Sequence, residues 1–275
     1  MHSRALPLVA MLCFASPVVA QLPQDLARER TEYLTWLRSA PTSPFAAIAL
    51  QRVGAGLTLG PAGSDVMLSG VAQVRVTESA GRVTLDSGGV STPLTRNRVM
   101  PLGSYRLLAA GAAGRTVLMV FGVPREVRTP VYFPFAPTAI DTVTLRPPQR
   151  RQSVLLLAPE GIDVEADEAG SVTVSRFGPP VSLRVRRFPG QSAEEWELEI
   201  YFRDATNGRG SYPAGRFVSL QPLGNGRYLL DFNRARNPFC AYSSVFPCPA
   251  PWPGNTLTEP VAAGERYGPA PEGEQ

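Results

Sequence analysis

Carboxylates near the C-terminal end are the side chains of this chain best suited to chemistry. Asp204 and Asp231 come at the ends of predicted strands, and Glu265 follows in the same polar stretch. Two carboxylates at a suitable separation can act as acid and base, as in glycoside hydrolysis. The three residues are therefore candidate catalytic groups. They also suit turns, because Asp204 precedes an Asn-Gly pair and can bond nearby backbone amides.

Five further residues of that stretch are candidates for binding a ligand. An arginine fork matches the geometry of a carboxylate or a phosphate, so a polar or anionic small molecule is favoured. In the alternative interpretation, Arg216 pairs with Asp231 or Glu265 and braces a segment that lacks regular hydrogen bonds. Both interpretations stay open. The ligand-binding candidates are Tyr212, Arg216, Asn233, Arg236 and Asn237.

The first twenty residues have the pattern of a secretory signal peptide. A basic start that includes Arg4 is followed by an apolar run at 5–14, and a Val-Val-Ala sequence favours cleavage after Ala20. Pro7 and Pro17 interrupt the apolar stretch, which is shorter than the ~20 residues of a membrane span. We expect a periplasmic or secreted protein that has no transmembrane segment after cleavage.

The residue types that are missing exclude several classes of enzyme. All 27 basic residues are arginine, and the single histidine, His2, lies in the predicted signal peptide. The mature chain therefore lacks an imidazole base, a Schiff-base lysine and the ligands of a usual zinc site. No Gly-rich dinucleotide fingerprint is present, so we expect neither a cofactor nor a metal. The arginines are scattered among acids, which argues against a nucleic-acid partner.

Two cysteines remain after the predicted cleavage. Cys240 and Cys248 are separated by seven residues, and export would place them where thiols oxidise. A structural disulfide is the favoured interpretation, with free thiols and a redox pair as alternatives. A redox role would need a lowered thiol pKa, and the spacing is not that of a Cys-x-x-Cys motif.

The pattern of apolar residues predicts mainly β structure with one N-terminal helix. Leu26, Leu34 and Leu37 recur on one face of 24–38, which indicates an amphipathic helix. Strands are expected at 73–77, 82–86, 105–108, 116–121, 153–157, 171–175, 182–186, 195–202, 216–220 and 227–232. In 195–202 the glutamates alternate with apolar residues, which predicts one wet face that includes Glu199. Trp252, in a Pro-rich loop, is expected to be exposed.

Proline-rich sequence near 124–137 marks a domain junction. We assign residues 1–20 to the signal peptide, 21–128 to the helix and a β-sandwich-like region, 129–268 to a second antiparallel β domain, and 269–275 to a disordered tail. The first β region loosely resembles a forkhead-associated sandwich around Leu59-Gly60 and Leu102-Gly103. Its phosphothreonine-binding residues are not matched, so the resemblance implies a shape alone.

Between residues 200 and 266 a series of short motifs follows in order. They are Asp204-Ala-Thr206-Asn-Gly208, Ser211-Tyr212-Pro-Ala-Gly215-Arg216, Asp231-Phe-Asn233-Arg-Ala-Arg-Asn237-Pro-Phe-Cys240, Pro247-Cys248-Pro249 and Ala263-Gly264-Glu265. This series resembles the signature of the bacterial family catalogued as domain of unknown function 1684. Ser211 and Arg236 depart from it, since the family favours Thr and Tyr there, and Trp252 disturbs its proline pair. The resemblance implies a β-rich domain with no assigned reaction.

These observations favour a periplasmic binding or interaction module for a small polar or anionic ligand. The alternative is a carboxylate-dependent hydrolase that acts on envelope glycans or similar substrates. A purely structural envelope protein, whose partner is another envelope component, is the second alternative.

Overall fold

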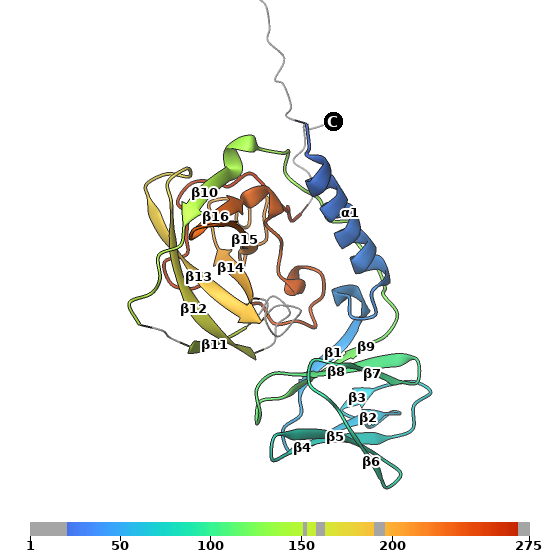
Figure 1. The fold of residues 1–275 in the computed structure, drawn as a ribbon. Helices are drawn as coiled ribbons and strands as arrows, with labels where there is room; N and C mark the ends of the chain where they lie inside the picture. Colours follow the sequence, from blue (N-terminus) through green and yellow to red (C-terminus); the bar gives the residue numbers. More distant parts are fainter. Residues whose placement is uncertain (1–20, 151–152, 158–162, 190–195, 269–275) are drawn as a thin grey trace, which may run out of the picture.

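The computed structural model describes residues 21–150, 153–157, 163–189 and 196–268, and this part of the chain is mainly β-sheet (Figure 1). The smaller lobe contains two sheets, in the orders β1-β9-β8-β7 and β3-β2-β4-β5-β6. Its strands are β1 (Ala47–Arg52), β2 (Leu57–Gly60), β3 (Val66–Met67), β4 (Val74–Ser79), β5 (Arg82–Ser87), β6 (Val90–Pro93), β7 (Val99–Leu102), β8 (Tyr105–Ala110) and β9 (Val117–Phe121).

The two sheets of this lobe share one apolar core. Leu59 and Val76 from one sheet pack in the same cluster as Leu118 and Val120 from the other. Because side chains alternate along a strand, the remaining residues of β9 point to the opposite side. There Val117, Met119 and Phe121 pack with Phe246 of the C-terminal segment, so β9 is buried on both faces.

The larger lobe is a seven-stranded antiparallel sheet in the order β10-β16-β15-β14-β13-β12-β11. Short 3-10 turns η2 (Pro137–Ala139), η3 (Phe232–Arg234) and η4 (Phe239–Ala241) flank it, as η1 (Pro44–Ala46) precedes β1. The strands are β10 (Ile140–Thr144), β11 (Ser153–Leu157), β12 (Asp163–Val174), β13 (Val181–Pro189), β14 (Trp196–Phe202), β15 (Arg216–Gly224) and β16 (Arg227–Asp231).

This sheet curls into a half-barrel whose concave side holds the core. Backbone bonds between Arg146 and Ser171 join the chain after β10 to β12 across the open side. Gly170 lies at a bulge with φ +145°, and a Cβ there would collide with the Arg146 carbonyl. Glycine is therefore required for this closure. Inside, Phe202 and Phe232 meet edge to face with ring centroids 5.1 Å apart.

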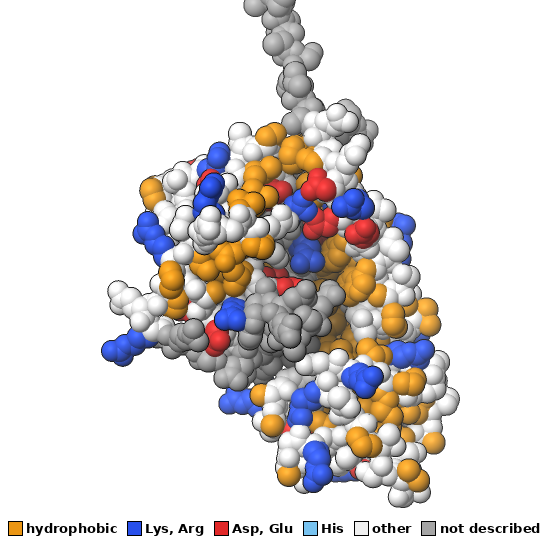
Figure 2. All heavy atoms as spheres, viewed as in Figure 1, with side chains coloured by type: hydrophobic (Ala, Val, Ile, Leu, Met, Phe, Trp, Pro, Cys, Tyr) orange, Lys and Arg blue, Asp and Glu red, His pale blue; other side chains and the backbone are white. Residues whose placement is uncertain are grey.

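One α-helix occurs among the described residues, α1 (Gln24–Ser39), and it lies along the larger lobe (Figure 1). Leu26 and Leu37 are buried, which fits the predicted apolar face. Arg234 forms ion pairs with Asp25 (2.5 Å), Glu29 and Asp231 (3.2 Å). These charges attach the helix to the turn that follows β16, and Figure 2 shows acidic and basic side chains gathered over α1.

The main sequence-based expectations for the fold are confirmed. The predicted helix and the 73–77/82–86 hairpin correspond to α1 and to the β4–β5 pair. The 216–220/227–232 hairpin is the β15–β16 pair. The forkhead-associated label and the domain boundaries stay predictions. The predicted signal peptide and C-terminal tail lie outside the described residues.

Two local expectations are wrong. Glu199 is 6% exposed, where a wet face was expected, because this side of β13 and β14 is covered. Its register partner on β13, Arg186, is buried under Trp252, and Tyr201 of β14 is buried as well. Trp252 is 7% exposed, since its ring packs over the Arg186 guanidinium at 4.6 Å. Within the described part of the chain, no helix has the length and apolar character that crossing a membrane requires.

Replacing Arg234 by glutamine should loosen α1, because Asp25, Glu29 and the buried Asp231 would lose their shared cation. We expect faster amide hydrogen exchange across residues 24–39 and a melting temperature about 2–4 °C lower. Arg28→Gln is the control, since Arg28 makes only an exposed pair with Glu32 at 3.8 Å. Equal exchange rates in the two variants would contradict this role of Arg234.

Candidate functional site

A fully buried ion pair lies at the centre of the C-terminal segment. Arg216 begins β15, and its Nη2 donates to Asp204 Oδ2 at 2.9 Å. Both side chains are 0% exposed. Burial lowers the pKa of Arg216, and the charge of Asp204 opposes that shift. A buried ion stays charged only where partners replace its hydration, so this pair depends on good geometry.

The remaining contacts of the pair organise the chain around it. Arg216 Nη1 donates to the carbonyls of Ala263 (2.5 Å) and Glu265 (3.2 Å), while Nη2 also reaches the Val261 carbonyl. Asp204 Oδ1 accepts from Thr206 N, Thr206 Oγ1 and Val261 N. Residues 261–265 lie outside the named strands and have only a bridge to Tyr132 and a few other backbone bonds. Arg216 and Asp204 add hydrogen bonds to the backbone of Val261, Ala263 and Glu265, which help to fix this segment.

A second polar cluster closes the end of β16. Asp231 Oδ1 accepts from the backbone N–H and the side-chain amide of Asn233, at 2.9 and 2.8 Å. Asn233 in turn bonds both polar backbone groups of Ala136 at 2.9 Å. The asparagine thus joins the entry to β10 to the exit from β16.

The polar groups of these two clusters therefore bond mostly to each other and to nearby backbone. The residues concerned are Asp204, Arg216, Asp231 and Asn233. These contacts are of the bracing kind, but the expected partners were wrong: the carboxylate that pairs with Arg216 is Asp204, and not Asp231 or Glu265. Their expected ligand-binding or catalytic roles stay predictions, and we do not carry them into the proposal below.

Glu265 occupies a different setting, at the wall of a cavity of about 410 Å³. We call this cavity the glutamate pocket; the residues used below that line it are Arg128, Asn237, Tyr242, Glu265, Arg266 and Tyr267. The Glu265 carboxylate accepts a short hydrogen bond from Tyr242 and one of 2.9 Å from the Asn237 backbone. The volume lies within the range typical of small-molecule sites.

Burial makes Glu265 titrate near neutrality. The side chain is 1% exposed, and desolvation raises its pKa from 4.5 to about 7 although the Tyr242 hydroxyl and the Asn237 N–H favour the charged form. The Tyr242 hydroxyl also meets Tyr33 of α1 at 3.2 Å. Desolvation and the charge of Glu265 both raise the pKa of Tyr242 well above its usual value. The pocket wall therefore carries a chain of hydroxyls that ends on a weakly acidic carboxyl.

Asn237 presents an unused acceptor in the same pocket. Its Nδ2 donates to the Arg266 carbonyl at 3.0 Å, but its Oδ1 is buried without a hydrogen-bond partner. Arg128 and Arg266 add positive charge to the lining. Arg128 is exposed and holds the carbonyls of Ala241 and Tyr242 at 3.2 and 3.3 Å.

The other two candidates, Arg236 and Tyr212, lie outside this lining. Arg236 is exposed, and its guanidinium carbon lies 5.7 Å from the centre of the Tyr33 ring. Desolvation lowers the pKa of Arg236, but the charge of Glu199 leads the effects that raise it, and the net shift is upward. The Tyr212 hydroxyl lies 3.2 Å from the Cys240 carbonyl, and its ring meets Tyr267 edge to face.

Cys240 and Cys248 are paired, as predicted. Cys240 and Cys248 lie at disulfide distance, with Cα atoms 5.5 Å apart. The bridge closes the loop between η4 and the Pro-rich segment. Since Asn237 and Tyr242 flank Cys240, this closure restrains the chain that forms one side of the glutamate pocket.

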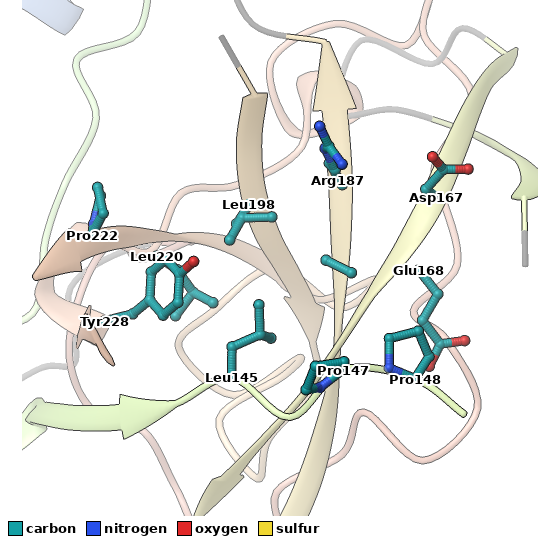
Figure 3. Close-up of a pocket in the computed structure, with 11 residues that line it drawn as sticks. Leu145, Pro147, Pro148, Asp167, Glu168, Arg187, Leu198, Leu220, Pro222 and Tyr228 are labelled. Atoms are coloured by element: carbon teal, nitrogen blue, oxygen red, sulfur yellow. The ribbon is translucent and has the colours of Figure 1, made fainter. Parts of the chain in front are cut away.

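A second cavity, of about 420 Å³, opens at the mouth of the half-barrel (Figure 3). Leu198, Leu220 and Tyr228 come to it from three adjacent strands, β14, β15 and β16. Asp167 and Arg187 stand across from them on β12 and β13 (Figure 3). Its lining has no buried polar atom without a partner among the residues described, which distinguishes it from the glutamate pocket.

Sequence reasoning did not select Tyr242, Tyr33 and Arg128. Tyr242 comes two residues after Cys240 in the motif series, and this position could have marked it as a candidate site residue. Tyr33 comes from α1, more than 200 residues away in the chain, and only the packing of α1 on the larger lobe brings it to Tyr242.

Comparison with known proteins agrees with the motif pattern. The family model described as "Protein of unknown function (DUF1684)" matches residues 128–266. The chain belongs to this family. The match includes Arg128, Asn237, Tyr242, Glu265 and Arg266 of the glutamate pocket. No curated protein matches the chain.

A similar solved structure is the solution NMR structure of an uncharacterized protein of Haloarcula marismortui. It is 32% identical to this chain, the similarity covers 52% of this chain and 78% of that one, and the TM-score is 0.44.

The raised pKa of Glu265 predicts how stability depends on pH. Between pH 4.5 and about 7 the folded protein keeps a proton that the unfolded chain releases. The free energy of unfolding should therefore fall as pH rises through this window, by up to about 1.4 kcal/mol per pH unit, and level off above it. Glu265→Gln should remove this contribution. Urea denaturation of both proteins at pH 5, 6, 7 and 8 measures the difference, and a difference that does not change with pH would contradict the prediction.

Proposed function

We propose that this protein is a binding module for a small polar ligand, which it takes into the glutamate pocket. The observation that carries the proposal is the buried Asn237 Oδ1, which has no hydrogen-bond partner and belongs to the lining. An unpaired buried acceptor costs about 1–3 kcal/mol, and a ligand N–H or O–H would recover that cost. The family match spans residues 128–266, which include most of the lining.

The lining suggests the chemistry of the ligand. Asn237 Oδ1 can accept a hydrogen bond from an N–H or O–H of the ligand, whereas the charges of Arg128 and Arg266 favour an anionic group. A small hydroxy- or amino-carboxylate combines the two. Glu265 adds a group that can be neutral or charged near pH 7, so affinity for such a ligand should depend on pH in this range.

We further propose that the protein works outside the cytoplasm, in the periplasm or after secretion. Two features support this location: the signal-peptide pattern of residues 1–20 and the paired cysteines. Disulfides persist in oxidising compartments. An envelope component remains a partner to test.

A hydrolase is the second candidate, because a carboxyl group with a pKa near 7 suits general acid or base catalysis. Glycoside hydrolysis by the common route needs two carboxyl groups. Glu265 is the one acidic side chain in the lining of the glutamate pocket as described. The absence of a second carboxylate there favours binding.

The direct test is calorimetric titration of the protein with L-lactate, L-malate, citrate, L-serine and L-glutamate at pH 6 and pH 8. Arg128→Gln should weaken binding of the best ligand about 10- to 100-fold, the usual size of a charge-assisted contact. Asn237→Leu should abolish it. Arg82→Gln, an exposed change in β5, is the matched control and should leave the affinity unchanged.

Binding that survives both pocket variants would contradict the location of the site. Turnover of p-nitrophenyl glycosides or esters that Glu265→Gln abolishes, with the fold retained, would favour the hydrolase instead. Absence of both binding and turnover would favour the structural role.

A further inference from the structure

The outer face of the half-barrel contains an arginine in an unusual environment. Arg186 lies on β13 and is paired in register with Glu199 of β14. Its neighbours in sequence, such as Val185, point into the core, so Arg186 points outward by alternation. The residue is nonetheless only 1% exposed.

None of the three guanidinium nitrogens of Arg186 has a hydrogen-bond partner. Arginine carries five N–H donors in a fixed planar fork and stays charged, so a buried fork with no acceptor is costly. Burial lowers the pKa of Arg186 to about 10, which still leaves it protonated at neutral pH. By contrast, the buried Arg216 has acceptors on both terminal nitrogens. Arg186 therefore lacks the hydrogen-bond acceptors that the fold provides for Arg216.

A second arginine lies beside Arg186. Its guanidinium lies 4.6 Å from the centre of the Trp252 ring, and that of Arg184, on the same face of β13, lies 5.7 Å from the same ring. Arg184 is exposed. The nearby carboxylate is that of Glu199, whose Oε1 accepts from Ser219 Oγ at 3.5 Å. Arg184 and Arg186 thus bring two positive charges to one tryptophan ring.

We propose that Arg186 and Arg184, beside Trp252, form a binding site for a small oxyanion. The guanidinium of Arg186 offers two parallel N–H donors, which match two oxygens of a carboxylate, phosphate or sulfate. Arg184 provides the exposed charge at which the anion arrives, and Trp252, which lies in the loop after the disulfide, covers the inner arginine. Neither arginine lines the glutamate pocket, so this site is separate from the proposed ligand site.

The test is thermal unfolding of the whole protein with inorganic phosphate, sulfate or acetate, at ionic strength held constant with sodium chloride. The wild-type melting temperature should rise by a few degrees at saturating oxyanion, since a ligand that binds only the folded state stabilises it. Arg186→Met keeps the length of the side chain and removes the unpaired charge. This variant should melt at or above the wild type in chloride alone, and should not respond to the oxyanion.

Arg184→Gln should weaken the response and shift the half-maximal concentration about 10-fold or more. Arg227→Gln, an exposed change on β16, is the control and should respond as the wild type does. The pattern across the anions identifies the source: a response to phosphate and sulfate alone indicates a tetrahedral oxyanion, and a response to acetate indicates a carboxylate.

Two results would overturn the proposal. One is an equal rise in the wild type and in Arg186→Met, which would be a general salt effect. The other is no rise in the wild type, whatever the melting temperature of Arg186→Met; a lower melting temperature of that variant in chloride would then make Arg186 a structural residue.

Discussion

The buried ion pair between Arg216 and Asp204 is the interaction on which the C-terminal part of the structure depends. Both side chains are removed from water, so each needs the other and the carbonyls and amides around them. Those partners come from residues 204–206 and 261–265, which are far apart in the chain and have few ladder bonds. Arg216 also binds the backbone carbonyl of Glu265, so the pair helps to position the chain that carries this residue.

This arrangement separates the polar residues of the family motifs into two groups. Asp204, Arg216, Asp231 and Asn233 satisfy one another and the backbone, as buried polar groups usually do. Glu265 and Asn237 are held by that framework but face a cavity, one with a shifted pKa and the other with an unpaired acceptor. A polar atom that a fold buries without a hydrogen-bond partner, as it does Asn237 Oδ1, is one for which a ligand is the simplest partner. Arg186 meets the same criterion on the outer face of the half-barrel.

The fold and the site differ in how much of them the sequence predicts. Period-two alternation and the Asn-Gly turn were enough for the β15–β16 hairpin, and the Leu spacing was enough for α1. Alternation failed for Glu199, because it reports which residues share a face and not whether another segment covers that face. The residue types of Asp204 and Glu265 were equally suggestive in the sequence. Only their burial and their hydrogen-bond partners distinguish a structural residue from a site residue. These depend on contacts between residues far apart in the chain, such as Tyr33 with Tyr242, which are more than 200 residues apart.

A double-mutant cycle at Arg216 and Asp204 tests the central claim most directly. The free energy of unfolding would be measured by urea denaturation for the wild type, Arg216→Met, Asp204→Asn and the double variant. Each single change should cost about 3–5 kcal/mol, because it leaves one buried charge unpaired. The double variant should cost far less than the sum. If the two losses instead add within about 0.5 kcal/mol, the residues are not coupled, and the ion pair does not organise this part of the protein.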